Sequence, residues 1–573
     1  MEVTFSEYFP YEHHAAELPP LNAGKESTPH QVVIAGGGPT GLVLALSLAK
    51  HGIASVVLEA DATVCTGSRA GAFTRRTMEI FDRIGVVDAV LDTSLRWKEG
   101  WTFLGMTEIA RLHVPDDENQ KFPPSISQLQ NYIEHCLVKE AERHRDLIDI
   151  RWQTRLRSLT NSDDGVSLAV ETADGDTYGM ETAWLVACDG GQSTVRRELG
   201  LRMRGERHVG RYVIIDIRVD NENVRAGRHC WFNPPSLLDG TLLMYKQPRG
   251  MIRFDYQIRE KDESWAAQPD EVLKRVQKHL DMLGIEGDWE PVWLSLYRAS
   301  ALTLDNYRHG RVLFCGDAAH LVPIFGVRGM NSAVEDAHNL AWKLAFTLRG
   351  LNDLWLLDTY SEERRFAALS NIRYASRGAE FMSPPSKPHR LMRDAVLSLA
   401  LNNPALRDLV IPRQHAATPL TASSLVIPDE HDEFEAGPAP GFVLPECPLI
   451  IHTQHGKREG YLTDLLGARF DILYFSESGD VPASVLHVCE ALMQTLPIKL
   501  HRVVRRTSEV ADEYVEDRTG RLFPLFGAQF GTLYLVRPDG HVMARWKQAD
   551  AKSLEAVMNK FALSQHHAEI TSA

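Results

Sequence analysis

The chain has 573 residues, of which 44% are hydrophobic and 24% are charged, and its acidic excess gives a formal net charge of −14. This length allows roughly two to four domains, and the missing basic excess argues against non-specific nucleic-acid binding. The seven cysteines show neither Cys-x-x-Cys nor zinc-ligand spacing, which predicts reduced thiols in a cytoplasmic protein without a metal site.

Residues 1–30 are polar, contain proline and lack the basic and apolar regions of a secretory signal. We expect an N-terminal arm, to which the sequence assigns no function. Residues 32–49 are uncharged, but the glycines and the proline of 36–41 would break a membrane-spanning helix. We therefore expect no membrane partner.

Residues 31–60 have the layout of a dinucleotide site: a strand at 32–35, a glycine turn, a helix at 42–50, a strand at 53–58 and an acid. Gly36 allows a tight turn, Gly38 lets the backbone approach a pyrophosphate, and Gly41 lets the helix pack close to the strand. The alternative is an ordinary glycine-rich turn. The predicted dinucleotide-binding residues are Gly36, Gly38, Pro39, Thr40, Gly41, Glu59 and Ala60.

The elements that follow indicate one cofactor domain interrupted by an insertion. Helices are expected at 75–85, 132–145, 269–283 and 331–349, and strands at 166–170, 184–188, 212–219, 241–245, 251–258 and 311–314. The extended runs between 212 and 258 predict an antiparallel sheet. We expect a cofactor domain of 31–205 and 300–400 around an inserted sheet domain of 206–299.

A linker is expected at 401–448, where acids are followed by prolines and glycines. Beyond it the pattern predicts strands at 470–475 and 498–504, a helix at 483–495, a hairpin of 532–536 with 541–546, and a helix at 553–563. This order resembles a thioredoxin-like domain over 449–573. Because it has no Cys-x-x-Cys, a structural role is favoured over a thiol-redox role.

Two more strand ends carry polar motifs. Residues 184–197 run into Asp189-Gly190, followed by Ser193 and Arg196, and residues 311–317 run into Gly316-Asp317. A strand-end acid such as Asp317 can accept hydrogen bonds from polyol hydroxyls. The helix expected near Asn331 would present free N–H groups and a partial positive charge that stabilises developing negative charge, such as that on a reduced flavin. The alternative for an isolated Gly-Asp is a strand-end turn.

With these three motifs in this order, the chain resembles the single-component flavin-dependent aromatic hydroxylases. That family includes 4-hydroxybenzoate, phenol and 3-(3-hydroxyphenyl)propionate hydroxylases. The resemblance covers residues 30–380, and residues 533–546 look like the C-terminal domain of the phenol and hydroxyphenylpropionate branch. It implies an α/β fold: a Rossmann-like FAD-binding domain with an inserted antiparallel-sheet substrate domain, plus a C-terminal thioredoxin-like domain.

The resemblance also implies residue roles. The three glycines of the turn would hold the FAD pyrophosphate and Glu59 the adenosine ribose. Asp189, with Gly190 and Arg196, would belong to a motif tied to both FAD and nicotinamide binding. The remaining implied cofactor contacts are Arg69 at the flavin, Gln128 and Asp317 (with Gly316) at the ribityl chain, the backbone of Gly329, Met330 and Asn331 at the isoalloxazine, and Pro323 near flavin and substrate.

The loop before Gly329 departs from the family's common form, because Val327-Arg328 replaces the usual glycine and a small or Gln residue. Arg328 at a flavin edge would alter cofactor mobility or bind a substrate anion. Alternatively, it points to solvent or to a phosphate.

The resemblance implies a reaction in which NAD(P)H reduces bound FAD, O2 forms a flavin C4a-hydroperoxide, and this species hydroxylates a phenolic ring. Only one glycine fingerprint is present, which fits a transient NADPH or NADH cosubstrate. A base that deprotonates the phenol would help, but the sequence does not identify it. A homodimer is common in the family.

The inserted sheet supplies four substrate-binding candidates beside Pro323: Trp231, Tyr245, Arg253 and Tyr256. Trp231 and Tyr256 could instead be core residues, and Arg253 could pair with Asp255. His320 is either a packing residue or a proton carrier.

Two other functions remain open at the level of sequence. One is a different flavin enzyme on the same scaffold, namely an oxidase, a reductase or a halogenase, although the Trp-x-Trp-x-Ile-Pro motif of halogenases is absent. The other is a non-catalytic FAD-fold binding protein, which the three intact motifs disfavour.

Overall fold

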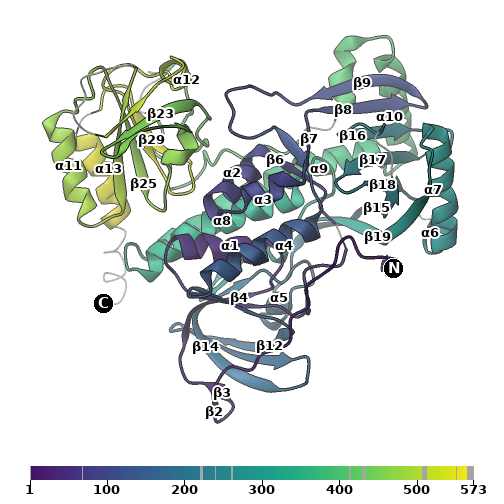
Figure 1. The fold of residues 1–573 in the computed structure, drawn as a ribbon, viewed down its shortest axis with the longest axis horizontal. Helices are drawn as coiled ribbons and strands as arrows, with labels where there is room; N and C mark the ends of the chain where they lie inside the picture. The colour runs from purple at the N-terminus through teal and green to yellow at the C-terminus, as the bar shows by residue number, and fades with distance from the viewer. Residues whose placement is uncertain are drawn as a thin grey trace.

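The computed structural model describes residues 2–67, 69–219, 223–238, 240–259, 262–411, 414–429, 434–505, 513–549 and 551–563. In Figure 1 a central α/β part lies between a nine-stranded sheet on one side and a C-terminal domain on the other. The α/β fold class predicted from the sequence is confirmed.

The centre is a parallel sheet whose strands end at the three sequence motifs. Its strand order is β11-β5-β4-β14, with β21 beside β14. The register aligns the last residues of β4, β14 and β21, which are Ala35, Ala187 and Phe314. These strands are β4 (His30–Ala35), β5 (Ser55–Leu58), β11 (Ile148–Arg151), β14 (Thr177–Ala187) and β21 (Val312–Phe314).

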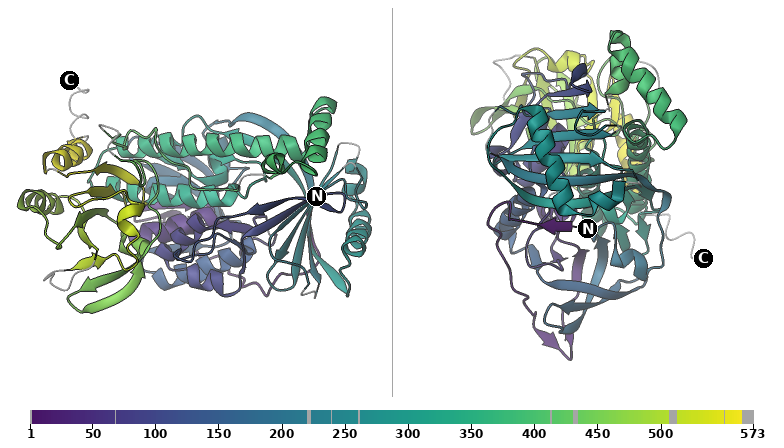
Figure 2. Two further views of the ribbon diagram at one scale, coloured as in Figure 1. Left: turned by 90° about the horizontal axis from the view of Figure 1, so that it is seen from above. Right: turned by 90° about the vertical axis from the view of Figure 1, so that its right-hand side faces the viewer.

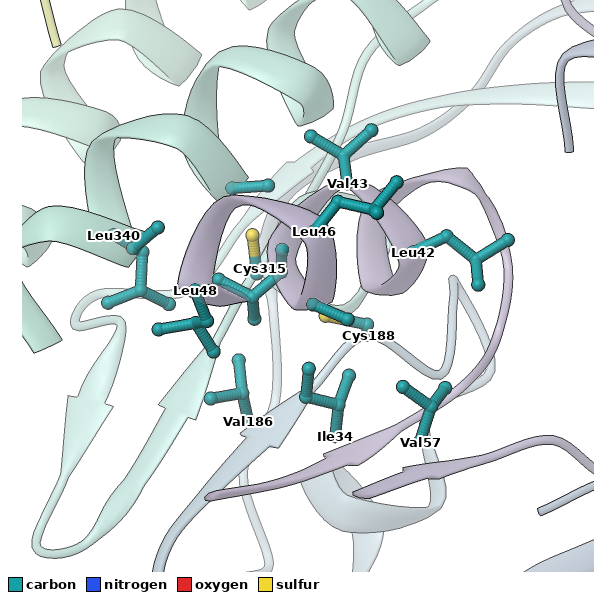
Figure 3. Packing of buried hydrophobic residues seen from close by; sticks show 14 of the residues in the cluster. Ile34, Leu42, Val43, Leu46, Leu48, Val57, Val186, Cys188, Cys315 and Leu340 are labelled. Atoms are coloured by element: carbon teal, nitrogen blue, oxygen red, sulfur yellow. The ribbon is translucent and has the colours of Figure 1, made fainter. Parts of the chain in front are cut away.

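Helix α1 (Pro39–Lys50) is buried because it packs between this sheet and two further helices, α4 (Gln130–Ala141) and α8 (Gly329–Leu348). Figure 3 shows its leucines among Ile34, Val57 and Val186 of the strands and Leu340 of α8. Burial on all sides explains the uncharged run at 32–49. Among the residues that the structure describes, no helix combines the length and the apolar character that crossing a bilayer requires.

Smaller elements complete the central part. An antiparallel meander extends the sheet below the helices in Figure 1. The elements are β2 (Leu21–Asn22), β3 (Lys25–Glu26), β6 (Ala72–Thr74), α2 (Arg75–Ile84), α3 (Val87–Asp92), β7 (Leu95–Trp97), β10 (Ser125–Ser127), η1 (Glu142–His144), β12 (Thr154–Asn161), β13 (Val166–Thr172), α5 (Thr194–Glu198), β20 (Arg308–His309) and η3 (Gly316–Ala318).

The nine-stranded sheet has the order β1-β19-β15-β18-β17-β16-β8-β9, with β22 paired to β19. Its strands are β1 (Glu2–Thr4), β8 (Glu99–Leu104), β9 (Thr107–His113), β15 (Arg204–Val219), β16 (Arg228–Phe232), β17 (Thr241–Gln247), β18 (Met251–Gln257), β19 (Trp289–Thr303) and β22 (His320–Leu321). The predicted insertion supplies β15 to β19. The sheet also takes β8 and β9 from outside it, and β1 from the N-terminal arm.

The outer face of this sheet is covered by α6 (Glu263–Ala266) and α7 (Pro269–Leu283), and α7 has the bounds predicted from the sequence. Two further helices, α9 (Trp355–Met382) and α10 (Lys387–Ala400), follow α8 and were not predicted, and η4 (Pro404–Val410) comes after them. Helix α9 buries Glu363 and Arg364, and such buried charges hide the usual amphipathic pattern. Figure 2 shows α9 running alongside α8 towards the nine-stranded sheet.

The C-terminal domain is built on a seven-stranded sheet of order β24-β23-β27-β26-β25-β28-β29. The predicted strands, hairpin and helices are confirmed, and β23, β24 and β27 are additional. Its thioredoxin-like character stays a prediction. The elements are β23 (Pro448–Thr453), β24 (Gly456–Tyr461), η5 (Leu462–Leu465), β25 (Phe470–Ser476), α11 (Ala483–Met493), β26 (Ile498–Val504), β27 (Tyr514–Glu516), α12 (Leu522–Leu525), β28 (Leu533–Val536), β29 (Val542–Trp546) and α13 (Ala551–Leu563).

The turn between β28 and β29 docks this domain onto the central helices. Arg537 pairs with Glu363 of α9 at 2.6 Å, and Lys343 of α8 contacts the same carboxylate at 2.6 Å. Asp539 accepts a hydrogen bond from Asn339 at 2.8 Å. All seven cysteines are free, and the structural role predicted for this domain stays a prediction.

Candidate active site

The three motifs predicted from the sequence meet at the ends of their strands. Gly36 has a φ of +103°, and a Cβ there would lie 2.5 Å from the carbonyl oxygen of Cys188. A Cβ on Gly316 would lie 2.7 Å from Oγ1 of Thr40. Arg196 donates to the carbonyl of Ala318 at 2.9 Å. The glycine turn, the Asp-Gly motif and the Gly-Asp motif therefore form one packed unit.

The glycines of this unit have two different functions. A Cβ on Gly41 would lie 2.0 Å from the carbonyl oxygen of Gly36, so this glycine permits the helix to approach the strand. Gly38, Gly190 and Gly329 instead line a cavity, and among the described residues no atom lies within 4 Å of the Cβ that each lacks. Such bare backbone at a cavity is what a closely approaching pyrophosphate and flavin require. These residues fit FAD.

The cavity has a volume of about 350 Å³ and extends from the glycine turn to the nine-stranded sheet. Asp317 is exposed within it, where a polyol could reach the carboxylate. Arg69 also lines the cavity, as the resemblance implied, and its side chain is largely exposed. Pro323 is buried and is not among the cavity residues, although its neighbours Val322 and Ile324 are.

Glu59 and Asp189 organise the loops at the cofactor side. Glu59 accepts hydrogen bonds from the N–H groups of Gly37 at 2.7 Å and Asp61 at 2.8 Å, and burial raises its pKa to about 7. Asp189 accepts from the N–H groups of Thr194 at 2.7 Å and Val195 at 3.0 Å, and burial raises its pKa. Their predicted contacts with a cofactor stay predictions.

The first turn of α8 faces the cavity through Gly329, Met330 and Asn331. The side chain of Asn331 accepts from the N–H of Thr74 at 3.1 Å and donates to the carbonyl of Val327 at 2.6 Å. It thereby fixes the loop, while the first backbone N–H groups of the helix have no acceptor within the helix. This end of α8 carries the partial positive charge that the sequence led us to expect.

Val327 and Arg328 both line the cavity, and the predicted position of Arg328 at a flavin edge stays a prediction. Val327 has a φ of +53°, an unfavourable conformation for a β-branched residue and the reason a glycine would suit this position. Arg328 is 6% exposed and donates to Oδ1 of Asn371 at 2.7 Å and to the carbonyl of Gln414 at 3.2 Å. It therefore ties the loop to α9 rather than pointing to solvent.

The glutamine expected at the ribityl chain needs a correction. Gln128 is fully buried, donates to the carbonyl of Val90 at 3.2 Å and to Thr93 at 3.0 Å, and does not line the cavity. Gln130, two residues later, lines it. The sequence could not separate the two, because the choice depends on where α4 begins.

The four candidates on the inserted sheet divide by strand alternation, since successive side chains point to opposite faces. Tyr245 and Arg253 line the cavity. Trp231 and Tyr256 do not, because they lie on the opposite face in the cluster beneath α7, where the Tyr256 hydroxyl contacts Nδ1 of His279 at 3.2 Å. The core interpretation of these two residues is therefore the right one.

Arg253 pairs with Asp216 rather than with Asp255. Its Nε donates to Asp216 Oδ1 at 2.8 Å and its Nη2 to Oδ2 at 2.7 Å, and a third donor, Nη1, reaches the carbonyl of Arg69 at 2.7 Å. Tyr8 of the N-terminal arm donates to the same aspartate. Sequence reasoning missed Asp216 because only the pairing of β15 with β18 brings it opposite Arg253.

His320 lies beneath the cavity in a buried ion-pair network. Its Nε2 contacts Asp336 at 2.6 Å, and Arg364 donates to the same carboxylate at 2.6 Å. His320 is 1% exposed and does not line the cavity. The packing role is therefore the one that the geometry supports.

Comparison with known proteins agrees with this geometry. The sequence profile described as "FAD binding domain" matches residues 29–375, and the profile described as "HcaD C-terminal domain" matches residues 449–561. The protein is thus a flavoprotein built on an FAD-binding domain.

The relatives with curated names indicate which kind of flavoprotein this chain resembles. A 3-(3-hydroxy-phenyl)propionate/3-hydroxycinnamic acid hydroxylase of Mycolicibacterium smegmatis is 28% identical over 531 residues, which cover 89% of each chain. A second hydroxylase of that name, from Burkholderia vietnamiensis, is 27% identical and covers 93% of this chain and 97% of its own. The flavin-dependent monooxygenase PieE, solved with FAD and substrate, superimposes with a TM-score of 0.79 at 21% identity, covering 94% of this chain and 100% of its own. The chain belongs to the FAD-dependent aromatic hydroxylase family, as the resemblance predicted.

Proposed function

We propose that this protein is an FAD-dependent monooxygenase that uses NAD(P)H and O2 to hydroxylate a phenolic or hydroxylated aromatic substrate. The observation that carries the proposal is the continuous cavity, which joins the bare glycine backbone of the cofactor wall to an aromatic and acidic wall on the nine-stranded sheet. The names of the curated relatives support the same reaction.

The cofactor wall would hold FAD mainly through backbone groups. Gly38 and the first turn of α1 would face the pyrophosphate, Asp317 the ribityl hydroxyls, and the first turn of α8 the electron-rich edge of the ring. Bound FAD would supply the redox chemistry, since it exchanges electrons with a nicotinamide and with O2. NADH or NADPH would bind transiently, because the sequence contains only one glycine fingerprint.

The sheet wall would hold the substrate ring. Trp293, Tyr297 and Ile324 supply aromatic and apolar surface at the cavity, and Tyr245 adds a ring beside Arg253. Apolar walls with a few polar groups orient a small ligand and exclude water from the reacting atoms. This composition suits a hydroxylated aromatic ring. A cytoplasmic location and a homodimer complete the proposal.

The test is oxidation of NADH and NADPH by the FAD-loaded protein against a panel of phenols and hydroxylated aromatic acids, with product mass and peroxide recorded. We expect at least one compound to accelerate oxidation and to gain one oxygen atom from isotopically labelled O2. Loss of two hydrogens would instead identify an oxidase, and incorporation of halide a halogenase. A protein that takes up no FAD would contradict the proposal and favour a binding protein.

A further inference from the structure

One acid of the sheet wall has no role in the site described so far. Asp255 of β18 lines the cavity and is 7% exposed. Its neighbours across the strands are apolar, because the register places Ile214 of β15 on one side and Leu243 of β17 on the other. A carboxyl group in such surroundings needs a specific reason to be there.

Among the described residues, Asp255 lacks the hydrogen-bond donor at Oδ1 and the paired cation that would be expected for a buried carboxylate beside Arg253. Oδ1 is buried and has no hydrogen-bond partner anywhere in the described part of the chain. The nearest cation on the same face is Arg253, but its guanidinium is held by Asp216 through two hydrogen bonds. The positive charge of Arg253 is therefore balanced by a different carboxylate. Burial raises the pKa of Asp255 to about 7; the positive charge of Arg253 lowers this pKa and the negative charge of Asp216 raises it, and both effects are smaller than that of burial.

The geometry of the wall indicates which ligand group would satisfy this oxygen. A buried acceptor without a donor is costly and rare in folded proteins. Around Asp255 the cavity offers Ile214, Tyr245 and Ser295, and none of them donates to it among the described contacts. The missing donor would then come from the ligand, and the donor carried by a hydroxylated aromatic ring is its O–H group.

We propose that Asp255 accepts the hydroxyl proton of the aromatic substrate and is thus the base of the hydroxylation, an assignment that rests on the proposed function. The substrate O–H bond breaks and an O–H bond forms at the carboxylate of Asp255. The electron pair stays on the substrate oxygen, so a phenol and a carboxylate become a phenolate and a carboxylic acid. Phenolate is the more electron-rich ring for oxygen transfer, and a carboxyl that titrates near neutral pH suits this exchange.

Other titratable groups also face Asp255. On β15 these are Asp216, which is ion-paired with Arg253, and Tyr212, whose pKa burial raises well above its usual value. On β17 burial likewise raises the pKa of Tyr245. Arg228 of β16 lies beyond Tyr245 in the register and is a permanent cation. A titration near pH 7 at this wall would therefore belong to Asp255.

Binding of a matched pair of ligands to the FAD-loaded protein tests the assignment. In anisole, the methyl ether of phenol, a methyl group replaces the proton that Asp255 would accept, and binding of both ligands is followed through the flavin absorbance. We expect the affinity of the wild type for phenol to rise about tenfold between pH 6 and pH 8, as a group of pKa near 7 ionises. Anisole should show no such rise, and Asp255→Asn should remove it for phenol.

Turnover of the best substrate from the panel gives a second readout. Asp255→Asn should lower kcat/KM for hydroxylation at least about 100-fold and abolish its rise through pH 7, since a positioned base contributes on this scale. Asp281→Asn, which removes a charge from the outer helix α7, is the matched control and should behave as wild type. Asp255→Leu matches the size of its apolar neighbours and replaces Asn if that variant fails to retain FAD.

The outcomes separate the two proposals. A wild type that oxygenates a phenol, with an Asp255→Asn variant of unchanged rate and pH profile, overturns the role of Asp255 alone. A wild type that oxygenates no phenol overturns the proposed function. In that case a pH-dependent preference for phenol over anisole that is lost in Asp255→Asn still supports Asp255 as the group that accepts the hydroxyl proton. If the wild type shows no such preference, the role of Asp255 is overturned as well.

Discussion

The two walls of the cavity are built by different means. The cofactor wall is made of backbone, with glycines at Gly38, Gly190 and Gly329 and the first turn of α8. The sheet wall is made of side chains from β15, β17, β18 and β19, including Arg253, which is ion-paired with Asp216, and Asp255, whose Oδ1 has no hydrogen-bond partner in the described part of the chain. A backbone wall depends on close packing, whereas a side-chain wall depends on the balance of buried charges.

This difference sets what each wall tolerates. Behind the cofactor wall, a methyl group on Gly36 or Gly41 would meet backbone atoms and displace a strand or a helix. At the sheet wall, shape changes are less important than leaving a charge without its partner. Three predictions test this contrast, and we order them from the largest expected effect to the smallest.

Asp216→Ala should be the most damaging. It leaves the Arg253 guanidinium, 3% exposed, without the carboxylate that holds it. Breaking a buried ion pair on one side costs about 3–5 kcal/mol of unfolding free energy, measurable by urea denaturation. The double variant Asp216→Leu with Arg253→Met removes both charges and should recover at least half of that loss. If the double variant is as unstable as the single one, the sheet wall depends on shape rather than on charge.

Asp255→Asn should stabilise the protein in alkaline solution while it impairs turnover. The pKa of Asp255 is raised to about 7 from 3.8, so the folded protein keeps a proton that the unfolded chain releases between these values. Wild-type stability therefore falls as pH rises through this window, and the asparagine variant lacks this loss. We expect Asp255→Asn to be more stable at pH 8 by up to about 4 kcal/mol, with the difference vanishing near pH 4. A constant difference across pH would contradict the raised pKa.

Gly41→Ala and Gly38→Ala make a matched pair within the glycine turn, of which only Gly38 lines the cavity. A methyl group on Gly41 meets the Gly36 carbonyl, so this variant should lose about 1–3 kcal/mol of unfolding free energy. A methyl group on Gly38 meets no described atom and should leave the melting temperature of the FAD-free protein unchanged while weakening FAD retention. Flavin content and thermal unfolding measure both effects. Equal melting temperatures for the two variants would remove the distinction between packing glycines and cofactor glycines.

Several elements could be read from local sequence because their signals are local. Helix α7 begins at its proline and ends at a glycine, and both bounds were predicted. The strand ends that carry Gly36, Asp189 and Asp317 were also predicted. Helix α9 was missed, since its buried Glu363 and Arg364 pair with residues far away along the chain.

Site residues on the sheet follow the same division. Tyr245 and Arg253 were found by their chemistry and reach the cavity, whereas Trp231 and Tyr256 have equally suitable chemistry and face α7. The one-residue alternation that separates them is visible only once the sheet has a known inner face. The partner of Arg253 was misassigned for a related reason. Asp255 is only two residues away along the chain, whereas the actual partner, Asp216, lies on another strand.

By itself, the sequence determined the dinucleotide turn, the order of the three motifs and the family, because these features depend on glycines and acids at fixed short spacings. Only the tertiary structure decided that the three strand ends meet, that Asp216 neutralises Arg253, and that Asp255 lines the cavity with an Oδ1 to which no described residue donates. Those facts depend on strand register and on burial, and both arise from contacts between residues that the chain keeps far apart.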